Sequence, residues 1–363
     1  MLLTDIQIYY PYVCPYRLVN IGYTLEDDGK ICVVYFNESK KLNRWTRNCI
    51  CEMSLVLEHL RRKDSIKCVI WSGVGRGFSS GAAFETNPRF ACPLSVRNAY
   101  QAKGLMGDKD DLALKNLTLS FLRFNKPSIA AVNGVCVGGA VNFAWFFHDI
   151  VIASHNANFM YPFSSIGITP ELGSSLFLPK TVGLSWSKKM FLLGQWTSAD
   201  EAMRLGLVNY VVPPETLINK SLEIARRLID RSQTSIKLTK QLVIESMGGW
   251  SRIEEVLDRE NAIIRTAMKS PDTKARIAAF QSKHEANKKN KKNKSKKKSK
   301  KKKNVTARVA KAKASGSFPS SKKRVQTSGA VVSVSEEEEH GATSSASDGR
   351  KQPQIIVPRR SRL

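Results

Sequence analysis

Two glycine-rich loops carry the residues whose types and spacing could do chemistry. In GFSSGAAFE (Gly77 to Glu85), a predicted strand ends in small residues that let a ligand approach the backbone closely. In NGVCVGGAV (Asn133 to Val141), a strand and a turn lead into a predicted helix through Gly138 and Gly139. Exposed N–H groups at a helix start are natural donors to anions. Either loop alone is weak evidence, but together they could present one N–H each to a single oxygen, as in a backbone oxyanion hole.

The elements around these loops alternate between strand and helix, which predicts an α/β fold with a mainly parallel sheet. Short runs rich in β-branched residues predict strands at 31–36, 66–71, 128–132 and 151–154. Apolar spacing predicts helices at 45–60, 112–124 and 138–147. From residue 198 onward helices dominate, with predicted ranges 198–205, 214–230, 235–246, 252–268 and 271–286. A helical last third after an α/β body indicates a packing or oligomerisation subdomain.

Charge separates a tail from the body. The chain of 363 residues has 58 Lys and Arg against 31 Asp and Glu. Residues 286–363 hold 23 of the basic and 5 of the acidic groups, which leaves 35 and 26 in the first 285 residues. The lysine-rich run KKNKKNKSKKKSKKKK repels itself and offers nothing apolar to bury, so we expect residues 287–363 to be disordered.

Other features argue against metal, membrane and secretory classes. The seven cysteines are scattered without a CxxC pair, and the five histidines show no ligand spacing. We therefore expect buried free thiols and no metal site. The N-terminus has no basic region before an apolar stretch, and the apolar tract 135–153 is broken by polar residues. We expect a soluble protein without a signal peptide or membrane span.

The motifs, taken in order, resemble the crotonase or enoyl-CoA hydratase/isomerase superfamily over about residues 25–283. They are FNESKKLN (Phe36 to Asn43), IWSGVGRGFSSGAAF (Ile70 to Phe84), KPSIAAVNGVCVGGA (Lys126 to Ala140), DIVIAS (Asp149 to Ser154) and TSADEAMRLGLVNYVV (Thr197 to Val212). The resemblance implies a ClpP/crotonase-like spiral of ββα repeats with a helical C-terminal trimerisation subdomain. On this frame we expect an N-terminal extension at 1–24, a crotonase core at 25–212, a helical oligomerisation subdomain at 213–286 and a tail at 287–363.

By the same resemblance, the N–H groups of Ala82 and Gly139 would hold the thioester oxygen of an acyl-CoA. The chain is one residue longer than typical after the second loop, which leaves Gly138 as the alternative to Gly139. The expected substrate-binding residues are Ser80, Gly81, Ala82, Ala83, Phe84, Gly138 and Phe163. No metal or redox cofactor is expected, because CoA arrives with the substrate.

The acidic side chains at the family's catalytic positions indicate whether the protein adds water or moves a double bond. Hydratases of this family use two glutamates, whose positions fall here on Asn142 and Phe163, and neither can act as an acid. The segment YPFSSIGITPELGSSLFLP (Tyr161 to Pro179) instead resembles peroxisomal Δ3,Δ2-enoyl-CoA isomerases, which implies Glu171 as the single catalytic base. One carboxylate can take a C2 proton and return one at C4 if the dienolate oxygen is stabilised. The sequence departs from the family at Ala83, where many relatives carry aspartate, and at Leu172, where a glycine or small residue is usual.

Two alternatives stay open. Outside the family frame, Glu171 reads as an ordinary glutamate at the surface or at a helix start. Within it, a non-catalytic acyl-CoA-binding or scaffold homologue would keep the fold, and its basic tail would suit such a role. An enoyl-CoA hydratase is disfavoured by the residues at 142 and 163. The resemblance also implies a homotrimer or hexamer.

The chain ends in Ser361, Arg362 and Leu363, a conservative variant of the Ser-Lys-Leu peroxisomal address. We expect recognition by a peroxisomal import receptor and a location in the peroxisome or a related organelle such as the glycosome. The preferred interpretation of the lysine run is a solvated linker. The second interpretation is a site of non-specific, salt-dependent contact with polyanions.

Overall fold

The structure is a computed structural model that describes residues 18–83 and 110–283. All of these belong to the first of two units into which the chain divides, residues 1–294 and 295–363. Phe84, the lysine-rich run and the terminal tripeptide Ser361 to Leu363 lie outside the described residues, so the predictions that rest on them stay predictions.

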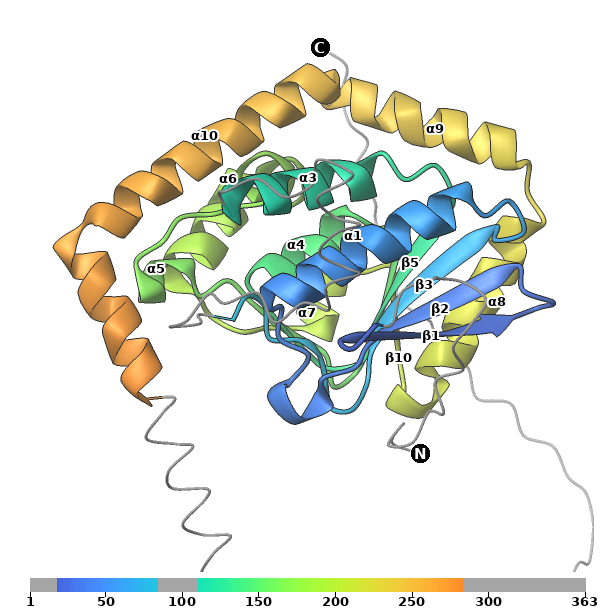
Figure 1. Cartoon of the computed structure of the whole chain (residues 1–363), viewed down its shortest axis with the longest axis horizontal. Helices are drawn as coiled ribbons and strands as arrows, with labels where there is room; N and C mark the ends of the chain where they lie inside the picture. Colours follow the sequence, from blue (N-terminus) through green and yellow to red (C-terminus); the bar gives the residue numbers. More distant parts are fainter. Residues whose placement is uncertain (1–17, 84–109, 284–363) are drawn as a thin grey trace, which may run out of the picture. The chain divides into compact units, whose positions relative to one another are not determined.

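The main sheet has six strands in the order β1-β2-β3-β5-β7-β10 (Figure 1). The first strand is antiparallel to its neighbour, and all the later pairs are parallel. The strands are β1 (Ile21–Glu26), β2 (Ile31–Phe36), β3 (Cys68–Gly73), β5 (Ser128–Val132), β7 (Ile150–Ser154) and β10 (Tyr210–Val212). The sequence predicted β2 and β5 with these bounds. It did not predict β1, which begins inside the expected extension 1–24 and pairs along its whole length with β2.

A second sheet has four short strands in the order β4-β6-β8-β9. They are β4 (Gly77–Ser79), β6 (Val135–Val137), β8 (Asn158–Met160) and β9 (Thr197–Ser198). Each of the first three follows directly on a strand of the main sheet and is followed by a helix: α3 (Asp110–Leu122), α4 (Gly139–Phe146) or α5 (Phe163–Ile166). The repeating unit is therefore strand, strand, helix, and its two strands contribute to different sheets. This is the expected crotonase spiral of ββα repeats.

The main sheet is buried on both faces, as parallel sheets usually are. Alternate residues of β2 and β3, such as Phe36 and Trp71, pack with α1 (Arg47–Arg62), α3 and α4. Their neighbours, such as Val33 and Ile70, pack with α8 (Leu217–Ile229) on the opposite face. Burying one such apolar side chain contributes about 1.5–3 kcal/mol. The main-sheet strands β3 and β5, which precede the two glycine-rich loops, are therefore packed on both faces.

The later part of the body is helical, as the sequence predicted. After α6 (Ser174–Leu193) come α7 (Ala199–Arg204), α8, α9 (Gln233–Ser246), α10 (Gly249–Lys269) and helical residues 271–283. The sequence did not predict α6, because it contains Pro179 and is kinked at Gly183, which has φ 80° and ψ 167°. In Figure 1, α10 and α9 follow one another along the upper edge of the view, above α6 and α3, and α10 contacts both of these helices.

Several finer observations bear on the class of protein. None of the helices in the described ranges is long and apolar enough to cross a membrane. Within those ranges, no group of three or more His, Cys, Asp or Glu side chains is placed to hold a metal ion. Five cysteines are described, and all are buried free thiols: Cys32, Cys49, Cys51, Cys68 and Cys136.

Candidate active site

The first glycine-rich loop runs alongside the start of α1. Trp45 N donates to Gly81 O and Ala83 N donates to Trp45 O, both at 2.8 Å, which makes a parallel bridge between Trp45 and Ala82. In such a bridge the N–H of the middle residue points away from the partner segment. Ala82 is exposed, and its N–H makes no hydrogen bond within the described residues. Ala82 N is therefore an available backbone donor, and the hydrogen bonds of Gly81 and Ala83 with Trp45 hold it in place.

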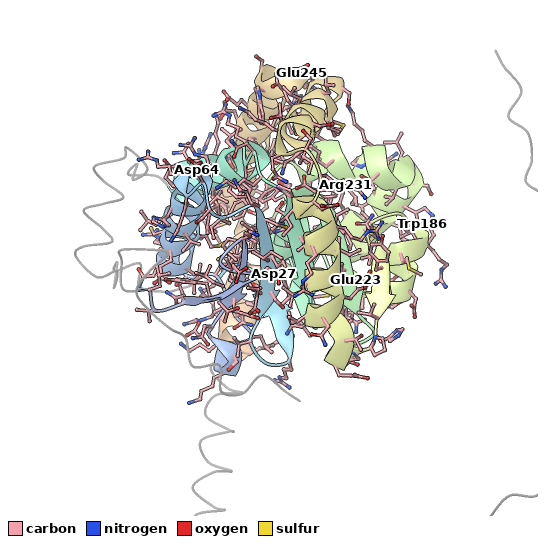
Figure 2. The ribbon with its side chains drawn as sticks, turned by 90° about the vertical axis from the view of Figure 1, so that its right-hand side faces the viewer. Asp27, Asp64, Trp186, Glu223, Arg231 and Glu245 are labelled. Atoms are coloured by element: carbon pink, nitrogen blue, oxygen red, sulfur yellow. The ribbon has the colours of Figure 1, made fainter. Side chains whose placement is uncertain are left out.

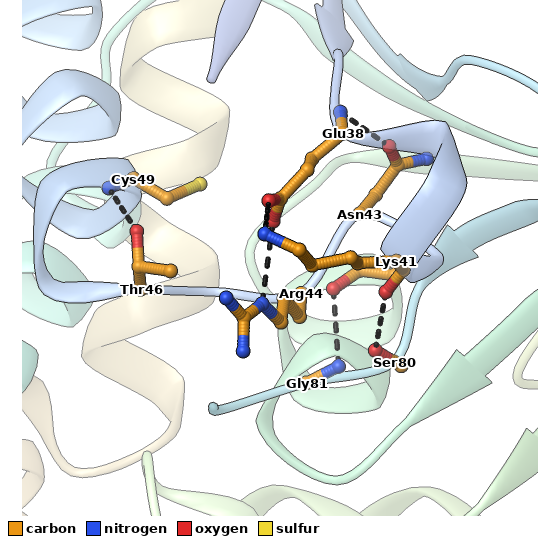
Figure 3. A network of polar contacts seen from close by, with 9 residues as sticks. Glu38, Lys41, Asn43, Arg44, Thr46, Cys49, Ser80 and Gly81 are labelled. Atoms are coloured by element: carbon orange, nitrogen blue, oxygen red, sulfur yellow. Dashed lines mark hydrogen bonds and ion pairs between the residues drawn. The ribbon is translucent and has the colours of Figure 1, made fainter. Parts of the chain in front are cut away.

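A polar network fixes the segment that holds this loop (Figure 3). Asn43 is almost fully buried, and its Nδ2 donates to Val74 O at 3.0 Å and to Gly77 O at 2.7 Å. Its Oδ1 accepts from Glu38 N at 2.9 Å. Ser80 N donates to the carbonyl of Leu42 at 2.8 Å. Leu42 and Asn43 both have positive φ, a strained conformation that the network must stabilise.

The second loop supplies a free N–H at the start of α4. Gly138, the N-cap, has φ 61° and ψ −129°, a conformation that essentially only glycine adopts. Its own N–H is used, because it donates to Met160 O at 2.9 Å. Gly139 N is one of the orphan donors of the first helical turn and makes no hydrogen bond within the described residues. Of the two glycines weighed from the sequence, Gly139 is thus the one with an available donor.

The two loops lie side by side. Strands β4 and β6, which lead into them, are parallel neighbours. A β-carbon on Gly81 would lie 2.4 Å from Val137 O and 3.9 Å from Gly138 Cα. Gly81 has φ 76°, so both its conformation and this close approach exclude a side chain. The free N–H groups of Ala82 and Gly139 therefore belong to adjoining loops at the same end of one small sheet.

Glu171 reaches the second of these loops. Its Oε1 lies 3.1 Å from the position that a β-carbon on Gly139 would occupy, and the side chains of Leu172 and Trp45 lie at 2.9 and 3.5 Å from it. Glu171 is half-buried. Its carboxylate oxygen Oε1 therefore lies beside the start of α4, where Leu172 Cδ1 and the ring of Trp45 also approach Gly139.

The backbone of Glu171 is held by three donors. Its carbonyl accepts from Asn142 Nδ2 at 2.8 Å, from Ser174 N at 3.0 Å and from Ser174 Oγ at 2.7 Å. Asn142 is fully buried, and its Oδ1 in turn accepts from Tyr161 Oη at 2.6 Å. The amide of Asn142 thus links Tyr161 to the Glu171 carbonyl, which Ser174 also holds.

The other predicted residues are placed less directly. Ser80 N and Ala83 N donate to Leu42 O and Trp45 O of the segment before α1, and Gly81 N donates to Ser79 Oγ at 3.1 Å. Phe163 is buried, and its ring stacks on Tyr161 with 5.3 Å between ring centroids. Its contact with substrate stays a prediction.

The sequence did not single out Trp45 as a site residue. It was expected only to be the first apolar residue of the predicted helix 45–60. The structure gives it two roles, bridging Ala82 by its backbone and approaching Gly139 by its ring. A tryptophan two residues after Asn43, at the end of the motif FNESKKLN, was the only available signal.

Comparison with known proteins identifies this architecture. The family model described as enoyl-CoA hydratase/isomerase matches residues 26–291. The chain belongs to the enoyl-CoA hydratase/isomerase family. This family lies in the crotonase superfamily, and its enzymes act on enoyl-CoA thioesters.

Relatives within the enoyl-CoA hydratase/isomerase family include enzymes named for both reactions. A short-chain-enoyl-CoA hydratase of Clostridium acetobutylicum is 33% identical over 264 residues, covering 72% of this chain and 95% of the relative. An enoyl-CoA hydratase structure from Mycobacterium avium subsp. paratuberculosis is 26% identical, covers 74% of this chain and 97% of that chain, and has a TM-score of 0.62. A monofunctional enoyl CoA isomerase structure from M. smegmatis is 29% identical, covers 65% and 98%, and has a TM-score of 0.52. The fold is common to both, so the side chains of the site must distinguish the reactions.

Proposed function

We propose that this member of the family is a Δ3,Δ2-enoyl-CoA isomerase, which converts a 3-enoyl-CoA to the (2E)-enoyl-CoA during β-oxidation of unsaturated fatty acids. The observation that carries the proposal is the position of Glu171 Oε1 beside Gly139. A thioester oxygen bound by the N–H groups of Ala82 and Gly139 would bring its neighbouring carbon close to this carboxylate.

The reaction needs one base and one anion site. Glu171 takes a proton from C2 of the substrate, and the C2–H electron pair is delocalised over the dienolate to the thioester oxygen. The same carboxyl group returns a proton at C4, so that the double bond moves from C3–C4 to C2–C3 and no co-reactant is consumed. Each backbone donor to the dienolate oxygen would lower the barrier by about 3 kcal/mol, or 100- to 1,000-fold in rate.

The side chains at two other positions favour isomerisation over hydration. Asn142 cannot act as an acid, and both ends of its amide are engaged, one with Tyr161 and one with the Glu171 carbonyl. Phe163 is apolar and buried. These are the positions at which the resemblance places the two water-activating glutamates of hydratases. Glu171 is then the carboxylate that the site offers to the substrate.

An exposed apolar surface supports the expected trimer or hexamer. It lies on the second half of α6 and the residues that follow, where four large apolar side chains are more than half exposed: Leu184, Leu192, Leu193 and Trp196. Trp186 lies at the outside of the same region (Figure 2). Exposed apolar clusters of this kind mark protein interfaces more often than free surface.

Purified protein incubated with 3-hexenoyl-CoA, with formation of the conjugated 2-enoyl thioester followed by absorbance, tests the proposal. We expect turnover on this substrate and much slower hydration of crotonyl-CoA, measured as loss of the same absorbance. Hydration faster than isomerisation would make the protein a hydratase. Binding of both thioesters without turnover of either would make it the non-catalytic homologue instead.

A further inference from the structure

A buried carboxylate from α10 reaches the loop that carries Glu171. Glu260 Oε2 accepts from Gly173 N at 2.7 Å, and its Oε1 accepts from Ser175 N at 2.9 Å and from the hydroxyl of Ser175. The residue is 5% exposed. Both of its oxygens are therefore committed to the backbone two and four residues after Glu171.

Glu260 caps α6 from another helix. The N-cap residue of α6 is Gly173, which has no side chain to accept from the orphan N–H groups of the first turn. A carboxylate near a helix N-terminus is also stabilised by the helix dipole. Burial raises the pKa of the Glu260 carboxyl, and the hydrogen bonds from Ser175 and Gly173 oppose that rise. No cationic side chain in the described part of the chain forms an ion pair with Glu260. Its carboxylate is held by the hydrogen bonds from Gly173 and Ser175.

The turn before α6, which carries the proposed base Glu171, has a strained backbone at the next residue. Leu172, between Glu171 and Gly173, has φ 56°, a conformation that disfavours a leucine by about 1–2 kcal/mol. The resemblance expects a glycine or small residue at this position. Leu172 Cδ1 and Glu171 Oε1 both face Gly139, so a relaxed turn would move both groups at once.

A second contact from the same helical region holds the other end of the loop. Thr273 Oγ1 donates to Gly167 O at 2.6 Å, and Thr273 is 3% exposed. A β-carbon on Gly167 would meet Thr273 Oγ1 at 2.8 Å, so the two segments are in direct contact. Residues from 260 onward thus fix both sides of the segment that contains Glu171.

We propose that Glu260 is a positioning residue, which holds the Leu172–Gly173 turn so that the Glu171 carboxylate stays beside Gly139. The proposal rests on the proposed function. It implies that the C-terminal helices complete the active site of their own chain. Glu260 does not touch substrate, and its effect is on the placement of the base.

The substitution Glu260→Gln tests this with little change of volume. An amide has only one acceptor oxygen, so either Gly173 N or Ser175 N must lose its partner whichever way the amide turns. We expect kcat for 3-hexenoyl-CoA to fall about 10- to 100-fold, because small misplacements of a reacting group have effects of this size. KM, and the Kd of the saturated thioester hexanoyl-CoA, should stay within about threefold. Amide hydrogen exchange should accelerate in residues 171–176.

The matched control is Glu255→Gln on the same helix, where an exposed carboxylate pairs with Arg252. It should leave kcat and exchange unchanged. If Glu260→Gln does not fold, the same measurements are made on Glu260→Asp, with the same expected results. The shorter side chain of aspartate cannot reach both N–H groups.

A kcat within twofold of the parent in a folded Glu260 variant would overturn the proposal. If the parent itself fails to isomerise, the proposed function falls, and the exchange data decide on Glu260 separately. Acceleration confined to 171–176 would then support the positioning role, and unchanged exchange there would contradict it.

Discussion

The carboxylate oxygen Oε1 of Glu171 lies 3.1 Å from the place where a β-carbon on Gly139 would stand. Glu171 belongs to the turn before α6, and Gly139 is the first residue of α4. The contact therefore joins an acidic side chain to a helix start with a free N–H. The proposed isomerase reaction uses this arrangement, with Glu171 as the base and Gly139 N as one donor to the enolate oxygen.

The glycine in this pair should be essential for turnover. A Gly139→Ala methyl group would meet Leu172 Cδ1 at 2.9 Å and displace the Glu171 carboxylate. We expect kcat on 3-hexenoyl-CoA to fall about 100-fold or more, with a loss of about 1–3 kcal/mol in the free energy of unfolding from overpacking. The control Gly29→Ala has open space around the methyl group and strains only the backbone, so it should lower stability without lowering kcat. Near-parental kcat in Gly139→Ala would show that the carboxylate does not work at this position.

The Tyr161–Asn142 pair should behave as a coupled unit. Asn142→Leu leaves the buried Tyr161 hydroxyl without its acceptor, which should lower the free energy of unfolding by about 1–3 kcal/mol. Glu171 O keeps the two donors of Ser174, so we expect only a small fall in kcat. Adding Tyr161→Phe removes the stranded hydroxyl and should recover part of the lost stability, as urea unfolding of the single and double variants would measure. Strictly additive losses would refute the coupling.

His148 should make stability depend on pH. Its ring packs edge-on against Phe143 with 4.7 Å between centroids, and both of its nitrogens are buried without a hydrogen-bond partner among the residues that the structure describes. Burial, with a smaller contribution from Lys240, lowers the pKa of His148 from 6.5 to about 3. Below pH 6.5 the unfolded chain binds a proton that the folded chain does not, so stability falls as the pH drops from 6.5 toward 3.

The slope from this one group is at most about 1.4 kcal/mol per pH unit. In His148→Phe this contribution should be missing, so the free energy of unfolding should decline less steeply between pH 6 and pH 4. Urea unfolding at several pH values measures both slopes. Equal slopes in the parent and the variant would show that another group controls the acid sensitivity.

The sequence predicted the elements with clear boundaries and missed those without them. Strand β5 follows Lys126-Pro127 and precedes Asn133-Gly134, and its predicted and observed bounds agree. Strands β4, β6 and β8 have three residues each, too few for a period of two to be visible. A proline and a glycine inside α6 concealed a helix of 20 residues, because tertiary packing overrides local propensity there.

The site was predictable to a different degree for each residue. The glycines of both loops stood out in the sequence, and the structure shows that Gly81 and Gly138 have positive φ angles and that a β-carbon on Gly81 would lie 2.4 Å from Val137 O. Glu171 was assigned from the family resemblance and not from its local pattern. Glu260 could not be found from the sequence, since it is a glutamate within an amphipathic helix, and its role arises only from the contact of α10 with Gly173 and Ser175.

The peroxisomal location remains a prediction from the last three residues of the sequence. Removing Ser361, Arg362 and Leu363 should leave a fluorescently labelled protein in the cytosol, because an import receptor reads this terminal tripeptide. Removing the lysine-rich run at 288–303 should leave the protein in peroxisomes if that run is only a linker. A cytosolic distribution of the full-length protein would contradict the prediction.

The most direct measurement is single-turnover isomerisation of 3-hexenoyl-CoA by Glu171→Gln beside the parent. Gln keeps the volume of the side chain and removes the base, so binding of hexanoyl-CoA should be retained while the rate falls by about three orders of magnitude or more. Undiminished isomerisation by the Gln variant would contradict the account, because the proton would then be moved by some other group.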